Sequence, residues 1–91
     1  MNEPSTTTIF RKDGFGVFAI FPYCSWNYRD KTCTGYAHIG QHMGIDYPYA
    51  IQTSKPAQPS EYQDLLNELK SIGYNPRIVR RASYRKMYTT S

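Results

Sequence analysis

The sequence predicts one small α+β domain, in which a mostly antiparallel sheet of about four strands carries a single helix on one face. Three observations predict it: a short apolar run between glycine and proline, a longer segment with helical periodicity, and short connections throughout. With 91 residues, 40% hydrophobic and 15% aromatic, the chain is long enough for one core. The expected order is βββαβ within residues 13–82, between a flexible arm over residues 1–12 and a basic, flexible tail over residues 83–91.

The first strand is expected at residues 15–21, whose letters FGVFAIF form a nearly continuous apolar run. Its length and aromatic content, with Gly14 before it and Pro22 after it, are typical of a strand buried on both faces at the centre of a sheet. The polar residues between Cys24 and Cys33 then predict a hairpin loop. The two cysteines either face each other as a disulfide or remain ordinary thiols, as a reducing compartment favours.

The chain is expected to return as one strand over residues 34–43, with alternating character. One face would carry Cys33, Ala37, Ile39 and Met43, and the other Tyr36, His38 and His42. The second set is a possible polar site. A turn at residues 45–48 and a third short strand at residues 49–53 follow.

The clearest element is a helix over residues 58–72. Its apolar stripe at i, i+3, i+4, i+7 and i+10 consists of Tyr62, Leu65, Leu66, Leu69 and Ile72. Two capping boxes are available at its start, Gln58 with Glu61 and Ser60 with Gln63, and serine is the better cap. The polar face is expected to carry Glu61, Asp64 and Glu68.

Gly73 stands where a left-handed residue often ends a helix. After a turn at residues 75–76, residues 77–81 predict a final strand. It should be half exposed or at an edge, because one face carries Ile78 and Arg80 and the other Arg77, Val79 and Arg81.

Positive charge is concentrated at the end of the chain. Residues 1–69 carry five Lys or Arg and seven Asp or Glu, a charge of −2, whereas residues 70–91 carry six Lys or Arg and no acid, a charge of +6. Such an asymmetry indicates an acidic partner, most often nucleic acid, or else a solvated tail. No stretch reaches the roughly 20 apolar residues of a membrane span, and the first residues lack the pattern of a signal peptide. The expected setting is the cytoplasm, with no membrane partner.

A set of short motifs resembles a pattern found in small uncharacterised bacterial and mobile-element proteins, of phage or plasmid type. The set comprises His38-Ile39-Gly40-Gln41-His42, Lys55-Pro56-Ala57, Glu61-Tyr62, Leu65-Leu66, Glu68-Leu69 and Ile72-Gly73-Tyr74. The resemblance covers about residues 15–81. It implies one domain in a cytoplasmic or phage-like setting, and it implies no activity.

The sequence gives little support for a catalytic site or a metal site. The set Cys24, Cys33, His38 and His42 has the ligand types that zinc prefers, but on one strand the Cα atoms of the two histidines would lie about 13 Å apart. No cofactor motif is present, since residues 14–16 lack the third glycine of a phosphate loop. We therefore expect no metal, no cofactor and no enzymatic activity, with a metal-dependent enzyme as the weakest alternative.

Binding chemistry is better supported. Basic residues interleaved with aromatic rings suit phosphate contact and base stacking, and they occur in two places. The candidate binding residues are Arg77, Arg80, Arg81, Tyr84, Arg85 and Lys86 near the C-terminus, and Trp26, Tyr28 and Arg29 on the hairpin loop. The sequence thus predicts a small binding protein for nucleic acid or a nucleoprotein complex. The alternative is a protein–protein interaction module, such as a phage-type, anti-CRISPR-like inhibitor of a host defence complex.

Overall fold

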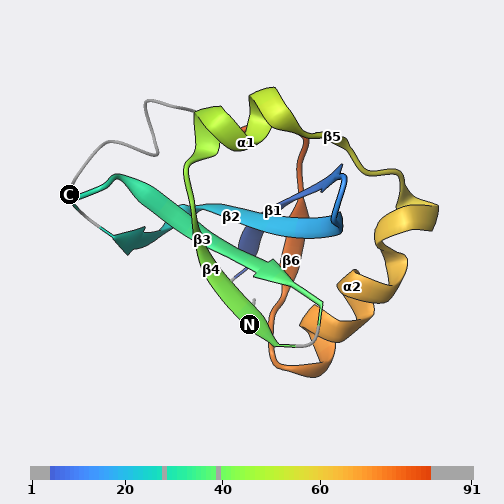
Figure 1. Ribbon diagram of the computed structural model, residues 1–91. Helices are drawn as coiled ribbons and strands as arrows, with labels where there is room; N and C mark the ends of the chain where they lie inside the picture. Colours follow the sequence, from blue (N-terminus) through green and yellow to red (C-terminus); the bar gives the residue numbers. More distant parts are fainter. Residues whose placement is uncertain (1–4, 28, 39, 83–91) are drawn as a thin grey trace.

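Six strands and two helices form an α+β fold in the part of the chain that the computed structural model describes, residues 5–27, 29–38 and 40–82 (Figure 1). The strands are β1 (Thr6–Asp13), β2 (Gly16–Asn27), β3 (Thr32–Ala37), β4 (Gln41–Ile45), β5 (Lys55–Pro56) and β6 (Pro76–Ile78). The helices are α1 (Tyr47–Thr53) and α2 (Pro59–Ser71). The predicted class and the mostly antiparallel sheet are confirmed, but four strands and one helix were too few.

The sheet has the order β4-β3-β2-β1-β5, and β6 also pairs with β1. Neighbouring strands run antiparallel except for β1 and β6, which are parallel. Two short strands share one side of β1: β5 pairs with Arg11 and Lys12, and β6 with residues 6–8. One edge of the sheet is therefore formed by two short strands, β5 and β6, and the opposite edge is formed by β4.

The predicted flexible arm over residues 1–12 is wrong for residues 6–12, which belong to β1. The three threonines at the start of β1 make it look polar in the sequence. Thr8 is nevertheless fully buried, and its hydroxyl donates to the Thr6 carbonyl (2.8 Å). Ile9 and Phe10 then point to opposite faces and are both buried. The strand forms because β2, which directly follows it, and β5 and β6, which lie far along the chain, pair with its backbone.

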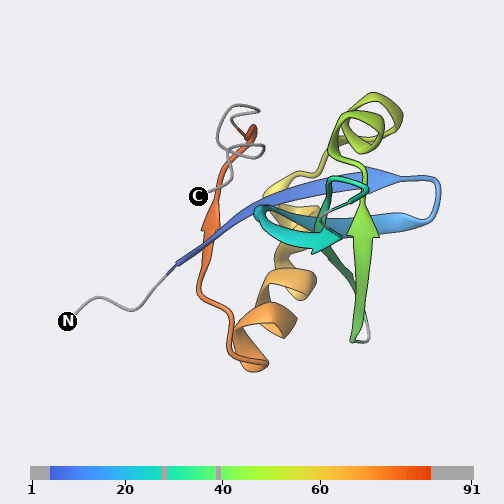
Figure 2. The same ribbon diagram turned by 90° about the vertical axis from the view of Figure 1, so that its left-hand side faces the viewer.

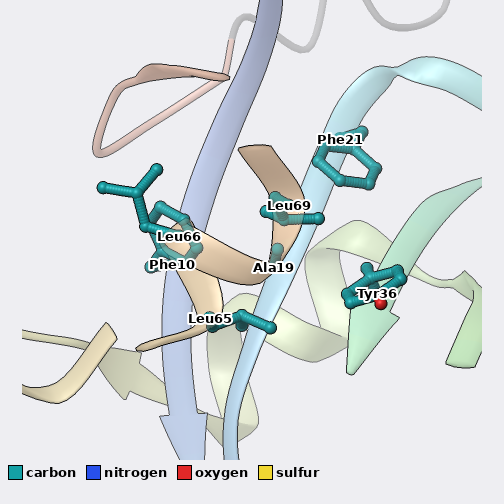
Figure 3. Packing of buried hydrophobic residues seen from close by; sticks show 7 residues of the cluster. All are labelled: Phe10, Ala19, Phe21, Tyr36, Leu65, Leu66 and Leu69. Carbon is teal, nitrogen blue, oxygen red and sulfur yellow. The ribbon is translucent and has the colours of Figure 1, made fainter. Parts of the chain in front are cut away.

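A helix covers each face of the sheet, and residues 19–21 of β2 are buried as predicted, whereas Phe15 precedes the strand and is fully exposed. One cluster packs under α2 and contains Phe10, Ala19, Phe21, Tyr36, Leu65, Leu66 and Leu69 (Figure 3). The other packs under α1 and contains Ile9, Ile20, Cys33, Ile45, Tyr47 and Ala50. Because neighbouring strand residues such as Ala19 and Ile20 join different clusters, β2 supplies both cores.

The β2–β3 hairpin differs from the prediction at its tip. β2 continues through Pro22 to Asn27, with an irregular register between Phe21 and Ser25, where the missing N–H of a proline is tolerated. The loop is therefore shorter than expected. Cys33 lies opposite Ser25, and the two cysteines are free thiols, Cys24 exposed and Cys33 buried.

The predicted single strand over residues 34–43 is two strands, because the chain turns between β3 and β4. Gly40 has φ +71°, a left-handed conformation that glycine adopts readily. The turn places Tyr36 directly opposite His42 across the β3–β4 pair. These two residues share a face as predicted, but as cross-strand partners.

The predicted third strand at residues 49–53 is wrong, since these residues belong to α1. Asp46 is the N-cap, its side chain accepting the Tyr49 N–H (3.2 Å), and Pro48 suits the first turn. At the other end the buried guanidinium of Arg11 donates to the carbonyls of Ile51 (3.0 Å) and Ser54 (2.6 Å). A strand residue thus caps a helix that is too short to be stable alone.

Helix α2 confirms the clearest prediction, with one difference at its start. Its N-cap is Gln58, whose N–H donates to the Glu61 carboxylate (2.8 Å), so the serine-based box is not used. At its end Gly73 has φ +108°, and the Tyr74 N–H donates to the Leu69 carbonyl (3.0 Å), as in a Schellman motif. Neither described helix is long and apolar enough to cross a membrane.

Candidate functional site

The basic segment after α2 is tied to the sheet by its backbone. β6 covers residues 76–78, fewer than the predicted 77–81, and lies at the edge, as expected. The Val79 N–H donates to the Thr8 carbonyl (2.9 Å), and the Ala82 N–H donates to the Tyr47 hydroxyl (3.1 Å). Because Val79 and Ala82 also pack against the core under α1, the chain between them is fixed at both ends.

The arginines of this segment project from that backbone. Arg77, Arg80 and Arg81 are all exposed. Arg77 donates to the Thr7 hydroxyl (3.2 Å), and neither Arg80 nor Arg81 forms a salt bridge within the described residues. Three positive charges within five residues are therefore presented to solvent. The other predicted binding residues of this segment, Tyr84, Arg85 and Lys86, lie outside the described residues.

The hairpin tip is a separate feature. Trp26 and Arg29 are exposed, and Tyr28 lies outside the described residues. The Trp26 ring lies over Gly44, where an added Cβ would approach ring atom Cδ1 to 2.4 Å. Because β1 lies between β6 and the β2–β3 hairpin, no strand pairing joins this tip to the basic segment within the described residues.

The three residues of the predicted polar site, Tyr36, His38 and His42, gather where the β3–β4 turn meets α2. Tyr36 donates its hydroxyl to Glu68, and His38 Nδ1 shares a hydrogen bond with the same carboxylate. The Gly40 N–H points at both the Tyr36 hydroxyl (3.0 Å) and Glu68 (3.3 Å). A single carboxylate from the helix thus binds three groups of the β3–β4 hairpin.

Glu68 is the residue that the sequence interpretation missed. It was assigned to the polar face of the helix, but its side chain is 18% exposed. The hydrogen bond from Tyr36 is the largest cause that lowers the pKa of Glu68 from 4.5 to about 2. The same bond, together with burial, raises the pKa of Tyr36. A signal was present, because Glu68 lies three residues after Leu65 and directly before Leu69, at the border of the apolar stripe.

His42 belongs to a neighbouring aromatic group. Its Nε2 is 2.8 Å from the Tyr74 hydroxyl, and its ring meets Tyr36 edge-on at 4.8 Å between centroids. Tyr74 in turn stacks on Phe21 at 4.8 Å. The β3–β4 hairpin is therefore joined to the end of α2 by rings as well as by Glu68.

The two histidines do not share a ligand site. The expected separation of about 13 Å assumed one continuous strand, which the turn at Gly40 interrupts, but each imidazole faces its own partner, Glu68 or Tyr74. Among residues 5–27, 29–38 and 40–82, no three Cys, His, Asp or Glu side chains are grouped as a metal site needs. The arrangement tethers the hairpin to the helix, and it holds the largely exposed His38 ring in a fixed orientation.

No protein-family model, curated protein or solved structure matches this chain. The resemblance to mobile-element proteins stays a prediction.

Proposed function

We propose that this chain is a small, non-catalytic binding protein that contacts nucleic acid or a nucleoprotein complex through its basic C-terminal segment. The observation that carries the proposal is the group of three exposed arginines, Arg77, Arg80 and Arg81, within a region of charge +6 that contains no acid. A cytoplasmic setting remains part of the proposal.

Local geometry supports phosphate binding by this segment. A guanidinium recognises phosphate oxygens through several donors, and it loses less affinity when the backbone that carries it is already ordered. The hydrogen bonds of Val79 and Ala82 supply that order on both sides of Arg80 and Arg81. Because these two arginines have no acidic partner among the described residues, a phosphate would not have to displace one.

A salt titration tests the proposal. Binding of short single- and double-stranded oligonucleotides would be measured for the wild type and for the Arg80→Ala/Arg81→Ala variant. Each lost phosphate contact should reduce the slope of log affinity against log salt by about 0.7–0.9, with similar losses for all sequences. The matched control is Lys55→Ala/Lys70→Ala, which removes the same charge from β5 and α2.

Two results would reject the proposal. One is an absence of oligonucleotide binding by the wild type even at low salt. The other is an equal loss in the control variant, because this would indicate only a response to net charge.

A protein–protein interaction module is the second candidate, and exposed rings favour it. Phe15 and Tyr49 are 101% and 65% exposed, and Trp26 is 52% exposed. Aromatic side chains are over-represented among the residues that dominate protein interfaces. An inhibitor of a host defence complex, of the phage type, belongs to this class. Its binding would depend on salt much less steeply than phosphate contacts do.

A further inference from the structure

An apolar groove lies on the α1 side of the sheet, next to strand β4 and on the opposite edge from β6. We call it the edge groove. Its volume is about 410 Å³, within the usual range for ligand sites of about 300–1,000 Å³. The lining comes from the end of β1, the β1–β2 turn, β2, the end of β3, β4 and α1, and it includes Phe15, Val17, Met43, Ile45 and Tyr49.

Two aromatic side chains at this groove are exposed to solvent. Phe15 is fully exposed at the β1–β2 turn, where its N–H donates to the Asp13 carboxylate (2.8 Å). Tyr49 is 65% exposed on the first turn of α1. Single exposed apolar residues are common, but two rings beside an apolar hollow are typical of an interaction site.

The charge of the groove indicates the charge of the partner that it binds. Its lining includes the carboxylates of Asp13 and Asp46 and no lysine or arginine among the described residues, although the chain as a whole has a charge of +4. This combination favours a basic ligand and repels phosphate. The edge groove is therefore unsuited to the nucleic acid proposed for the basic segment.

Strand β4 offers backbone groups beside the groove. It is the outermost strand at its end of the sheet, and within the described residues it pairs only with β3 (Figure 2). Alternate residues of such an edge strand direct N–H and C=O groups outward. Met43 and Ile45, two residues apart on β4, both belong to the groove. A strand added to β4 would therefore place every second side chain on the groove side.

We propose that β4 and the edge groove together bind an extended, basic peptide segment of a partner protein. The peptide backbone pairs with β4, its aromatic or long aliphatic side chains enter the groove against Tyr49 and Phe15, and its lysines or arginines lie near Asp13 and Asp46. This inference is independent of nucleic-acid binding, since it uses the other edge of the sheet.

The test uses a fluorescein-labelled six-residue peptide whose every second residue, on the groove side, is lysine, phenylalanine and lysine in turn, with threonine between them. Binding is followed by fluorescence anisotropy. The lysine peptide should bind, and a matched peptide with glutamate in place of lysine should not. N-methylation of the peptide amides should abolish binding, and bound peptide should protect the amides of β4 from hydrogen exchange. Equal binding of the glutamate peptide, or unchanged exchange at β4, would overturn the proposal.

Variants locate the peptide on the surface. Tyr49→Ala and Phe15→Ser should each weaken binding about tenfold, the scale expected for an interface anchor. Asp13→Asn and Asp46→Asn keep the oxygen that accepts a backbone N–H, so they should preserve the fold while reducing affinity and its salt dependence. The control is Ile72→Ser, which removes an exposed apolar side chain beside α2.

Thermal melting of each variant separates lost binding from lost folding. An equal effect of Ile72→Ser and Tyr49→Ala would overturn the proposal, because binding would then be nonspecific. So would a dimer of the wild type that Tyr49→Ala dissociates, since the occupant would then be a second copy of the chain. The Arg80→Ala/Arg81→Ala variant should bind the lysine peptide as the wild type does.

Discussion

Tyr36 on β3 donates its hydroxyl to Glu68 on α2, across 32 residues of sequence, and this contact joins the β3–β4 hairpin to the helix. The Tyr36 ring is buried in the core under α2, while its hydroxyl reaches the carboxylate at the edge of that core. The carboxylate also binds His38 and the Gly40 amide, so one acid orders the turn between β3 and β4 that carries His38.

Stability should depend on Glu68 between pH 4.5 and about 2. Its pKa is lowered in the folded state, so the stabilisation is complete above pH 4.5 and is lost as the pH falls toward 2. Tyr36→Phe removes the largest cause of the shift. The variant should therefore melt at a lower temperature than the wild type at pH 6, and the difference should shrink as the pH approaches 2.

Melting curves by circular dichroism at pH 2, 3, 4 and 6 measure this difference. Glu68→Gln should give the same trend, whereas Asp64→Asn, which changes an exposed acid of the same helix, should not. A difference between wild type and Tyr36→Phe that stays constant from pH 6 to 2 would contradict the prediction.

Leu69 should be the most costly leucine of α2 to truncate. It is fully buried among Phe10, Phe21 and Tyr36 (Figure 3), and Leu69→Ala should reduce the free energy of unfolding by about 2–5 kcal/mol. Ile72, at the end of the same stripe, is 51% exposed, so Ile72→Ala should cost about 0.5 kcal/mol or less. Urea unfolding measures both. Similar losses would show that the core under α2 is misplaced.

Gly35 is expected to be constrained by Ile45. A Cβ at position 35 would lie 2.1 Å from Ile45 Cδ1 and 3.2 Å from the Ala19 carbonyl oxygen, so Gly35→Ala should cost about 1–3 kcal/mol through overpacking. Ile45→Ala alone should cost about 2–5 kcal/mol through a cavity. In the double variant the new methyl group occupies part of that cavity, and the total loss should be smaller than the sum.

A double-mutant cycle by urea unfolding measures this coupling. Gly14→Ala is the matched control, because a Cβ there meets no described atom within 4 Å. Strict additivity of Gly35→Ala and Ile45→Ala would show that the two residues do not touch.

Part of the candidate site was readable from the sequence. The charge split identified the arginines of the C-terminal segment, and alternation placed Tyr36 with His42 on one face. Glu68 was missed because a helical position at the border of an apolar stripe faces either solvent or a neighbouring strand, and only the packing of α2 on β3 decides which. The edge groove was missed for a similar reason, since its lining comes from four strands and a helix.

The sequence by itself determined the elements that local physics specifies. Helix α2 follows from the spacing of Leu65, Leu66 and Leu69 and from Gly73 at its end, and strand β2 follows from an apolar run with few charges. Only the tertiary structure decided β1 and α1. The Thr-rich start of β1 becomes a strand because β2, β5 and β6 satisfy its backbone. The seven residues of α1 are too few to be stable alone, and they become helical because Tyr47 and Ala50 are buried and Arg11 binds the carbonyls at the helix end.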